Sequence, residues 1–523
     1  MLYMHDIWVW SENANVDLGE IKYSKISTQP ILDQSATLLA KATKSPLITY
    51  NILILFSFIS AAVLTFIISF RITKNYLASF IAGLLFSFSP YHLRHAQNHL
   101  EIAQIEIIPF YFLYLYEFIK NSSRKKATVT GIALAIATLT VNYYGFFLGI
   151  LTVVYILYDL IIKRFNPIKK QIINYTILFV TALAIIAGCN INYIKIASQN
   201  KNLDEYTWKA LGKTDLDYVS YAAKPWFYIL PDIENPMLGN FSKNILIKIS
   251  QNTPYYLTRE FTANEHSLYI GIIPVILTIL ALTLKSKTTK KFILFALVFV
   301  VISFPPYIFI FMKKIVLPSF VLMETFPMFR VYARSGLITL FMVSLTASIG
   351  VSILTNNLKK KLRNLVITLI IGTLSLVELY TVSKYERLLP LPPEYTSKQV
   401  KEAKIVLESP KLEDHTTTFY QIYHQKPVYF VRTEGHLEID VNDVKTQLAR
   451  SETNIPLIFR GDFQQIYFEH KINEKGLDLQ NPNTGNISIT KELERTNKSV
   501  GLIKSEGLKE VFHYNETYLF EKN

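Results

Sequence analysis

At 523 residues the chain has the length of two or three soluble domains, but half of its residues are apolar and its mean hydropathy is +0.25. The single cysteine, Cys189, excludes an intramolecular disulfide and a zinc site built from cysteines. The net charge of +14 raises the question of a nucleic-acid partner, and the positions of the charged residues exclude one.

The chain begins with a polar segment, residues 1–47, that contains neither an apolar run nor a signal peptide. Repeated apolar runs of membrane-spanning length follow, and they predict transmembrane helices rather than the core helices of a soluble protein. We place about ten of them, at 48–70, 76–90, 104–119, 127–142, 145–162, 171–190, 267–284, 291–311, 335–356 and 364–383.

Lysine and arginine gather in five short loops between these runs, which contain eighteen basic and no acidic residues. All five loops lie on one face if the helices alternate, as cytoplasmic loops do. The charge excess therefore indicates membrane topology, not nucleic-acid binding. The loops are 71–74, 120–126, 163–170, 285–291 and 359–363.

This topology divides the chain into a partial first outer loop (1–47), a transmembrane domain (48–384) with outer loops 191–266 and 312–334, and an external domain (385–523). Because nothing in 1–47 explains how that segment crosses the membrane, we expect a further transmembrane helix upstream of Met1. The high usage of Lys, Ile and Asn suggests an AT-rich prokaryotic genome, so we expect a multi-pass protein of a prokaryotic plasma membrane.

A polar cluster follows the second apolar run directly. The spacing of His92, His95 and His99 predicts that they share one helical face, with Arg94 beside them. Such groups at membrane depth line a cavity, a substrate path or a headgroup site. We interpret the histidines as sugar or phosphate contacts and Arg94 as a cation for a phosphate. The alternatives are an interfacial helix with solvated polar groups and a histidine metal site.

Two further outer features point to ligands. Loop 191–266 is rich in Tyr and Trp, which serve either as membrane-interface anchors or as platforms for a sugar ring. Arg330 and Arg334 precede the ninth run, four residues apart on one face. Because they oppose the usual charge bias, we expect an anionic partner, either lipid headgroups or a lipid-linked phosphate.

Carboxylates on the predicted outer face are candidates for a general base that deprotonates a sugar hydroxyl. The sequence contains no P-loop, no Gly-x-Ser-x-Gly, no His-Glu-x-x-His and no dinucleotide-binding fingerprint, so those chemistries have no support. The candidates are Asp6, Asp17, Glu20, Asp33, Glu101, Glu106, Asp215, Asp217 and Glu265.

After Tyr385 the composition changes, and a proline-rich linker leads into a charged segment without a membrane-length run. We expect a small α+β domain there. Alternation and turn chemistry predict strands at 426–432 and 457–460, a short helix at 500–507, and a closing hairpin of 509–514 and 517–522.

Several motifs occur in a fixed order along nearly the whole chain. Together they resemble the prokaryotic polytopic membrane proteins with a GT-C-type glycosyltransferase fold, akin to the YfhO-like membrane proteins. The motifs are Tyr50-Asn51, the segment from Phe86 to Leu93 with Gln97-Asn98-His99, Asn142-Tyr143-Tyr144-Gly145, Asp217 to Tyr221 with Pro231 and Asn235-Pro236, Glu265 to Gly271, Phe329 to Arg334, and Tyr420 to Pro427.

The resemblance implies an α-helical, GT-C-like membrane protein that transfers a sugar, with inversion, from a polyprenyl-phosphate donor to a glycan, lipid or protein acceptor on the outer face. In such folds a first-loop acid acts as the base, which makes Asp6 the nearest match and Asp17 the alternative, unless the base lies upstream of Met1. No metal or other cofactor is assigned, and a divalent metal stays open. The substrate-binding candidates are His92, Arg94, His95, His99, Glu101, Glu265, Arg330 and Arg334.

Two other functions fit the same topology. One is a transporter of polyprenyl lipid or polysaccharide, for which internal repeats or paired broken helices would be expected; no clear repeat is present. The other is a non-catalytic envelope-assembly protein whose C-terminal domain is a binding module.

Overall fold

The computed structural model describes 29–162, 168–191, 218–219, 221–252, 265, 267–310, 313–356, 361–381, 392–409, 424, 426, 428–431, 433–434, 438–439, 441–449, 455–460, 489–514 and 517–522. The described residues form two compact units. The helical unit comprises 29–36 and 48–381. The C-terminal unit comprises 37–47 and the described residues from 392 onward.

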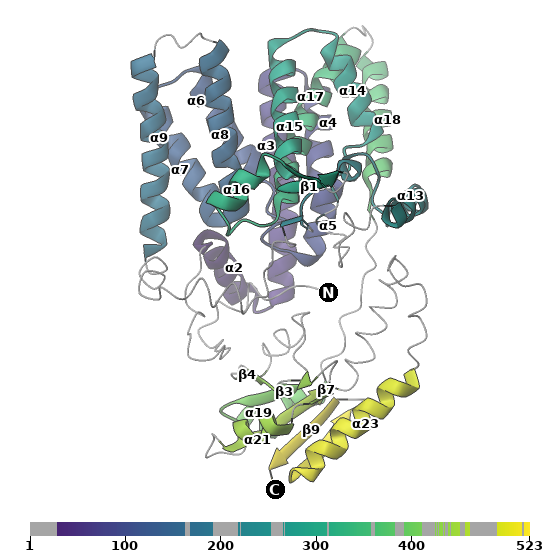
Figure 1. Cartoon of the computed structure of the whole chain (residues 1–523). Helices are drawn as coiled ribbons and strands as arrows, with labels where there is room; N and C mark the ends of the chain where they lie inside the picture. The colour runs from purple at the N-terminus through teal and green to yellow at the C-terminus, as the bar shows by residue number, and fades with distance from the viewer. Residues whose placement is uncertain are drawn as a thin grey trace. The chain divides into compact units, whose positions relative to one another are not determined.

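All ten apolar runs form helices, as the sequence predicts (Figure 1). Five of these helices, namely α3, α8, α9, α17 and α18, are long and apolar enough to cross a membrane. The other five have 11 to 17 residues, and their role as spans stays a prediction. The bounds are α3 (Pro46–Thr73), α4 (Tyr76–Ser87), α6 (Ile107–Lys120), α7 (Arg124–Thr140), α8 (Asn142–Ile162), α9 (Ile168–Cys189), α14 (Ile272–Leu282), α15 (Lys287–Ser303), α17 (Gly336–Asn356) and α18 (Lys361–Leu379).

Large apolar side chains are exposed along the long helices, for example Leu55 and Phe56 on α3, Leu183 on α9 and Leu369 on α18. Such a surface is unfavourable in water but suits the hydrocarbon core of a bilayer, where a helix satisfies its own backbone hydrogen bonds. The chain is therefore an α-helical polytopic membrane protein with a small C-terminal sheet domain, as expected.

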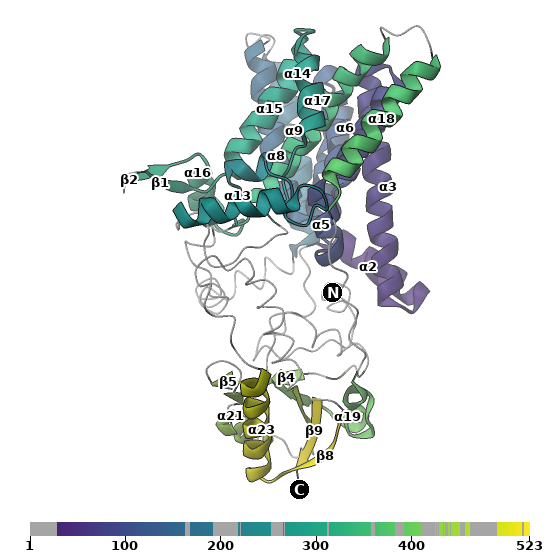
Figure 2. The same ribbon diagram turned by 90° about the vertical axis from the view of Figure 1, so that its right-hand side faces the viewer.

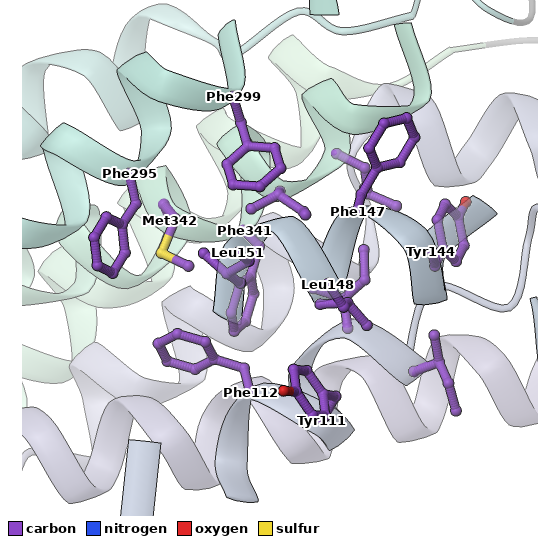
Figure 3. Packing of buried hydrophobic residues seen from close by; sticks show 14 of the residues in the cluster. Tyr111, Phe112, Tyr144, Phe147, Leu148, Leu151, Phe295, Phe299, Phe341 and Met342 are labelled. Atoms are coloured by element: carbon purple, nitrogen blue, oxygen red, sulfur yellow. The ribbon is translucent and has the colours of Figure 1, made fainter. Parts of the chain in front are cut away.

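Aromatic side chains dominate the core of the helical unit, where α6, α8, α15 and α17 meet (Figure 3). The Phe112 ring of α6 packs edge-on against Phe341 of α17, with ring centroids 5.3 Å apart. Inside this core the Tyr111 hydroxyl forms a hydrogen bond with the Thr152 hydroxyl of α8, with the two oxygens 2.5 Å apart. The core fixes the helix ends that carry the polar groups described below.

The short elements of the helical unit gather at one end of the bundle, here called the α5 end (Figure 2). The sequence predicts this end to be the outer one. The elements there include α5 (Pro90–Asn98), η2 (Pro225–Tyr228), α13 (Gly239–Asn252), β1 (Tyr307–Ile310), β2 (Lys313–Val316), α16 (Ser319–Thr325) and η3 (Tyr332–Ser335).

Two segments differ from the sequence-based expectation. Helix α2 (Pro30–Thr43) occupies part of the segment interpreted as an outer loop. The predicted span 291–311 is wrong in its last part, because α15 ends at Ser303 and Pro305 and Pro306 follow. Proline has no N–H to continue a helix, and the chain instead forms the antiparallel pair β1–β2.

The C-terminal unit contains a five-stranded sheet of order β4-β3-β7-β9-β8, in which β3 is parallel to β4 and β7 and the other pairs are antiparallel. One apolar cluster, which includes Val444 of α21 and Ile503 of α23, packs on one face, and a second, with Tyr395 and Val400, packs on the other. The elements are η4 (Pro393–Thr396), α19 (Lys398–Glu402), β3 (Val406–Ser409), β4 (Val428–Phe430), β5 (Thr433–Glu434), β6 (Glu438–Ile439), α21 (Val441–Ala449), β7 (Leu457–Arg460), α23 (Ile489–Ser505), β8 (Leu508–Tyr514) and β9 (Thr517–Lys522).

The predicted strands and the closing hairpin correspond to β4, β7, β8 and β9 and are confirmed. The helix predicted at 500–507 is wrong in its bounds, because α23 begins at Ile489 and ends at Ser505. Strand β3 was not predicted; like β7, it is buried at all four residues and shows no alternation.

Candidate functional site

The short helix α5 places the histidine-arginine segment. Pro90 stands in its first turn, where the fixed backbone of proline suits a helix start. The helix ends at Asn98, and His99 has an extended backbone. The prediction that the three histidines share one continuous helical face is therefore wrong at His99. His92 and Arg94 are fully buried, so α5 is not a solvated interfacial helix either.

His92 belongs to a network inside the protein. Its Nδ1 lies 2.7 Å from the Ser87 carbonyl, its Nε2 lies 3.2 Å from the Ser57 hydroxyl, and its ring stacks on Phe58 at 3.9 Å. The Ser57 hydroxyl in turn lies 2.5 Å from a Glu106 carboxylate oxygen. Burial lowers the pKa of His92 to about 4. His92 is thus neutral at pH 7, and both of its nitrogens are used within the fold, which leaves the predicted substrate contact without support.

Arg94 is paired with carboxylates. Its Nε and Nη2 donate to the two Asp232 oxygens at 2.9 and 2.8 Å, and its Nη1 donates to Glu234 at 2.8 Å. Burial lowers the pKa of Arg94, but the negative charges and hydrogen bonds of Asp232 and Glu234 outweigh this effect, so that the pKa is raised overall. The predicted role of Arg94 as a phosphate-binding cation is therefore not supported: the guanidinium is committed to two acids of the same unit.

The acidic turn that holds Arg94 is itself fixed. Asn235 donates its side-chain amide to the carbonyls of Glu378 and Tyr380, at the end of α18, and accepts from the Met237 and Leu238 backbone N–H groups. Arg94 therefore connects α5 through this turn to α18.

A second ion pair lies at the same end. Arg334 of η3 donates through Nε and Nη2 to Oε1 of Glu265, at 3.0 and 2.7 Å. The other Glu265 oxygen, Oε2, lies 3.9 Å from Nε2 of His95. All three side chains are buried. The structure thus brings three of the predicted site residues together, from three segments distant in sequence.

Tyrosines enclose this group. The guanidinium carbon of Arg334 lies 4.5 Å from the centroid of the Tyr143 ring, and the electron-rich face of the ring stabilises the positive charge. The Tyr91 ring packs against His95 with centroids 4.2 Å apart. Burial, followed by His99 and Arg334, lowers the pKa of His95 well below its usual value, so His95 is neutral at pH 7.

Of the remaining predicted residues, His99 contacts His95, and the others contact different side chains or lie outside the described residues. Arg330 is half-buried, with its guanidinium carbon 5.3 Å from the Tyr221 ring. His99 Nδ1 lies 3.4 Å from His95 Nδ1, and Glu101 accepts from Gln29 at 2.6 Å. The predicted bases Asp6 and Asp17 lie outside the described residues, as do Asp215 and Asp217.

Sequence reasoning missed the partners of Arg94. Asp232 and Glu234 lie within the segment Pro231 to Pro236, whose prolines and asparagine are a signal for a structured loop. Tyr91 and Tyr143 were noticed only as parts of motifs.

Across the described ranges, no group of three or more His, Cys, Asp or Glu side chains is arranged to hold a metal ion.

Comparisons with known proteins give two similarities. The model of a family described as a domain of unknown function, DUF6311, matches residues 3–235, which include α5 and the turn with Asp232 and Glu234. No curated protein matches the chain. Among solved structures, the chain is similar to the crystal structure of ArnT from Cupriavidus metallidurans in the apo state, with a TM-score of 0.40 and 10% identity, over 99% of this chain and 92% of that chain.

Proposed function

We propose that the chain is a membrane glycosyltransferase that moves a sugar from a polyprenyl-phosphate donor to an acceptor of the cell envelope on the outer face. The observation that carries the proposal is the buried pair of Arg334 and Glu265 beside His95 and Tyr143, at one end of an apolar helix bundle. Burying an ion pair costs desolvation free energy, and ionisable groups inside membrane proteins are functional-site candidates.

A lipid-linked phosphate accounts for the position of the arginines. Arg330 and Arg334 lie in the segment that leads into α17, on the face predicted to be outside, where cations are not favoured by topology. Guanidinium groups bind phosphate through paired, charge-assisted hydrogen bonds. A fixed cation near the leaving phosphate stabilises the negative charge that develops as the sugar is transferred.

Aromatic rings beside the arginines suit a sugar. Phe329 stacks on Phe146 with centroids 4.2 Å apart, and Tyr143 packs edge-on against Phe329 at 5.3 Å. Tyr221 lies beside Arg330. Tyr221 belongs to loop 191–266, so its contact with Arg330 supports the sugar-platform interpretation of that loop, and the other rings extend the aromatic surface beyond it.

The test is the release of polyprenyl phosphate, because every acceptor gives that product. The purified full chain in lipid nanodiscs is mixed with polyprenyl-phosphate hexoses and pentoses and an extract of envelope glycans and lipids, and products are measured by mass spectrometry. We expect acceptor-dependent release, reduced at least tenfold in Arg330→Met and unchanged in the control Lys313→Met, on exposed strand β2.

The rival functions give different results in the same system. A transporter moves the intact lipid-linked sugar between leaflets without release of polyprenyl phosphate. A non-catalytic assembly protein binds envelope components without either event. Absence of release from every donor would overturn the proposal.

A further inference from the structure

One oxygen of Glu265 and one nitrogen of His95 face each other and form no hydrogen bond to any described residue. Glu265 Oε2 and His95 Nε2 are 3.9 Å apart, too far for a direct hydrogen bond. Among the residues that the structure describes, neither atom has a hydrogen-bond partner, and both side chains are more than nine-tenths buried. Leaving a buried carboxylate oxygen and an imidazole nitrogen unsatisfied costs free energy, so their juxtaposition indicates a place for a third group.

The chemistry of the two atoms defines that group. Because His95 is neutral, its Nε2 is either a donor or an acceptor, and Nδ1, which faces His99 at 3.4 Å, takes the other role. With the proton on Nε2, the imidazole donates while the carboxylate accepts. An oxygen about 2.8 Å from both atoms fits the 3.9 Å separation and satisfies both. A hydroxyl has the needed lone pair and proton.

We propose that the acceptor of this enzyme is an alcohol whose nucleophilic hydroxyl is held between His95 Nε2 and Glu265 Oε2, with Glu265 as the base. The proposal rests on the proposed function and assigns the base differently from Asp6 and Asp17. The hydroxyl proton passes to Oε2 of Glu265. The oxygen forms a bond to the anomeric carbon, and the bond from that carbon to the donor phosphate breaks, leaving its electron pair on the phosphate.

The ion pair gives this step a second consequence. Arg334 is bound to the other oxygen of the same carboxylate. When Glu265 takes up the proton, it loses its negative charge and the Arg334 charge is no longer balanced by it. Proton transfer therefore raises the local positive charge as negative charge develops on the phosphate, which stabilises the transition state more than the ground state.

The kinetic test compares Glu265→Gln with wild type in the polyprenyl-phosphate release assay. We expect kcat to fall at least 100-fold, with little change in the KM for the donor and with partial recovery in Glu265→Asp. His95→Gln, whose amide can reach the position of Nε2, should retain more activity than His95→Leu. The matched control is Glu117→Gln, which breaks the half-exposed Arg71 pair and should leave kcat unchanged.

Thermal unfolding of each variant separates loss of fold from loss of chemistry. Anomeric-carbon NMR shifts of the product distinguish transfer to oxygen from transfer to nitrogen.

A binding test does not depend on turnover. The full chain with ¹⁵N-labelled histidine is reconstituted in nanodiscs, and octyl glucoside is added as a hydroxyl-bearing probe. We expect the Nε2 resonance of His95, assigned with His95→Gln, to shift in wild type and not in Glu265→Gln. A shift without any donor turnover would retain the hydroxyl site and reject the glycosyltransferase. Full activity in Glu265→Gln, a nitrogen-linked product, or no shift at His95 would overturn the hydroxyl site.

Discussion

Arg94 and Asp232 lie 138 residues apart in sequence and form a two-pronged ion pair, with Nε–Oδ2 and Nη2–Oδ1 distances of 2.9 and 2.8 Å. Glu234 binds the third guanidinium nitrogen. The pair joins α5, which carries His95, to the turn that Asn235 fixes on α18. Arg94 is thus a positioning residue for the proposed site.

We expect Arg94→Met to destabilise the protein because it leaves Asp232 buried without its cation. Removing one partner of a buried pair costs about 3–5 kcal/mol. The control is Arg71→Met, which breaks a half-exposed pair with Glu117 and should cost less than about 1 kcal/mol. Thermal unfolding in detergent measures both. Equal transition temperatures for the two variants would contradict the prediction.

The buried network of His92 predicts a stability that depends on pH. The folded-state pKa is about 4, below the usual 6.5, so the unfolded chain takes up this proton first as the pH falls. The contribution of His92 is complete above pH 6.5 and is lost between pH 6.5 and 4, by up to about 3 kcal/mol.

The check is a comparison of wild type with His92→Gln, which cannot titrate. The difference in unfolding temperature between the two proteins should shrink as the pH is lowered from 7.5 to 4.5. His95 is also buried and neutral, so both proteins should still lose stability in acid. A difference that stays constant with pH would show that His92 is not neutral in the folded state.

The helices could be predicted from sequence because each forms from an uninterrupted apolar run, and the runs of α3, α8, α9, α17 and α18 are long enough to match the thickness of a bilayer. Their ends were less predictable. The run that contains α15 continues past its last residue, Ser303, and only the two prolines that follow it mark the change of structure. Strand β3 was not predictable by alternation, since it is buried on both faces.

The three ionisable members of the candidate site were among the predicted residues, but their pairing and the enclosing tyrosines were not predicted. His95, Glu265 and Arg334 lie in three segments, and no local pattern in the sequence indicates that they meet. For the same reason, the sequence could not rank the arginines as candidates for binding a phosphate. Arg94 and Arg334 both lie near aromatic residues in the sequence, while the described structure pairs Arg94 with two acids and Arg334 with one.

Close packing of α14 on α17 gives the last prediction. A Cβ added at Gly350 of α17 would lie 2.1 Å from the Leu277 carbonyl oxygen of α14, and backbone cannot yield as a flexible side chain does. We expect Gly350→Ala to cost at least about 1–3 kcal/mol, the usual penalty for overpacking. Gly149 of α8 is the matched control, because no atom of the described part of the chain lies within 4 Å of the position of its Cβ. Alanine is the better helix former by about 1 kcal/mol, so Gly149→Ala should be neutral or stabilising. An unfolding temperature of Gly350→Ala at or above that of the wild type would show that α14 and α17 do not pack this closely.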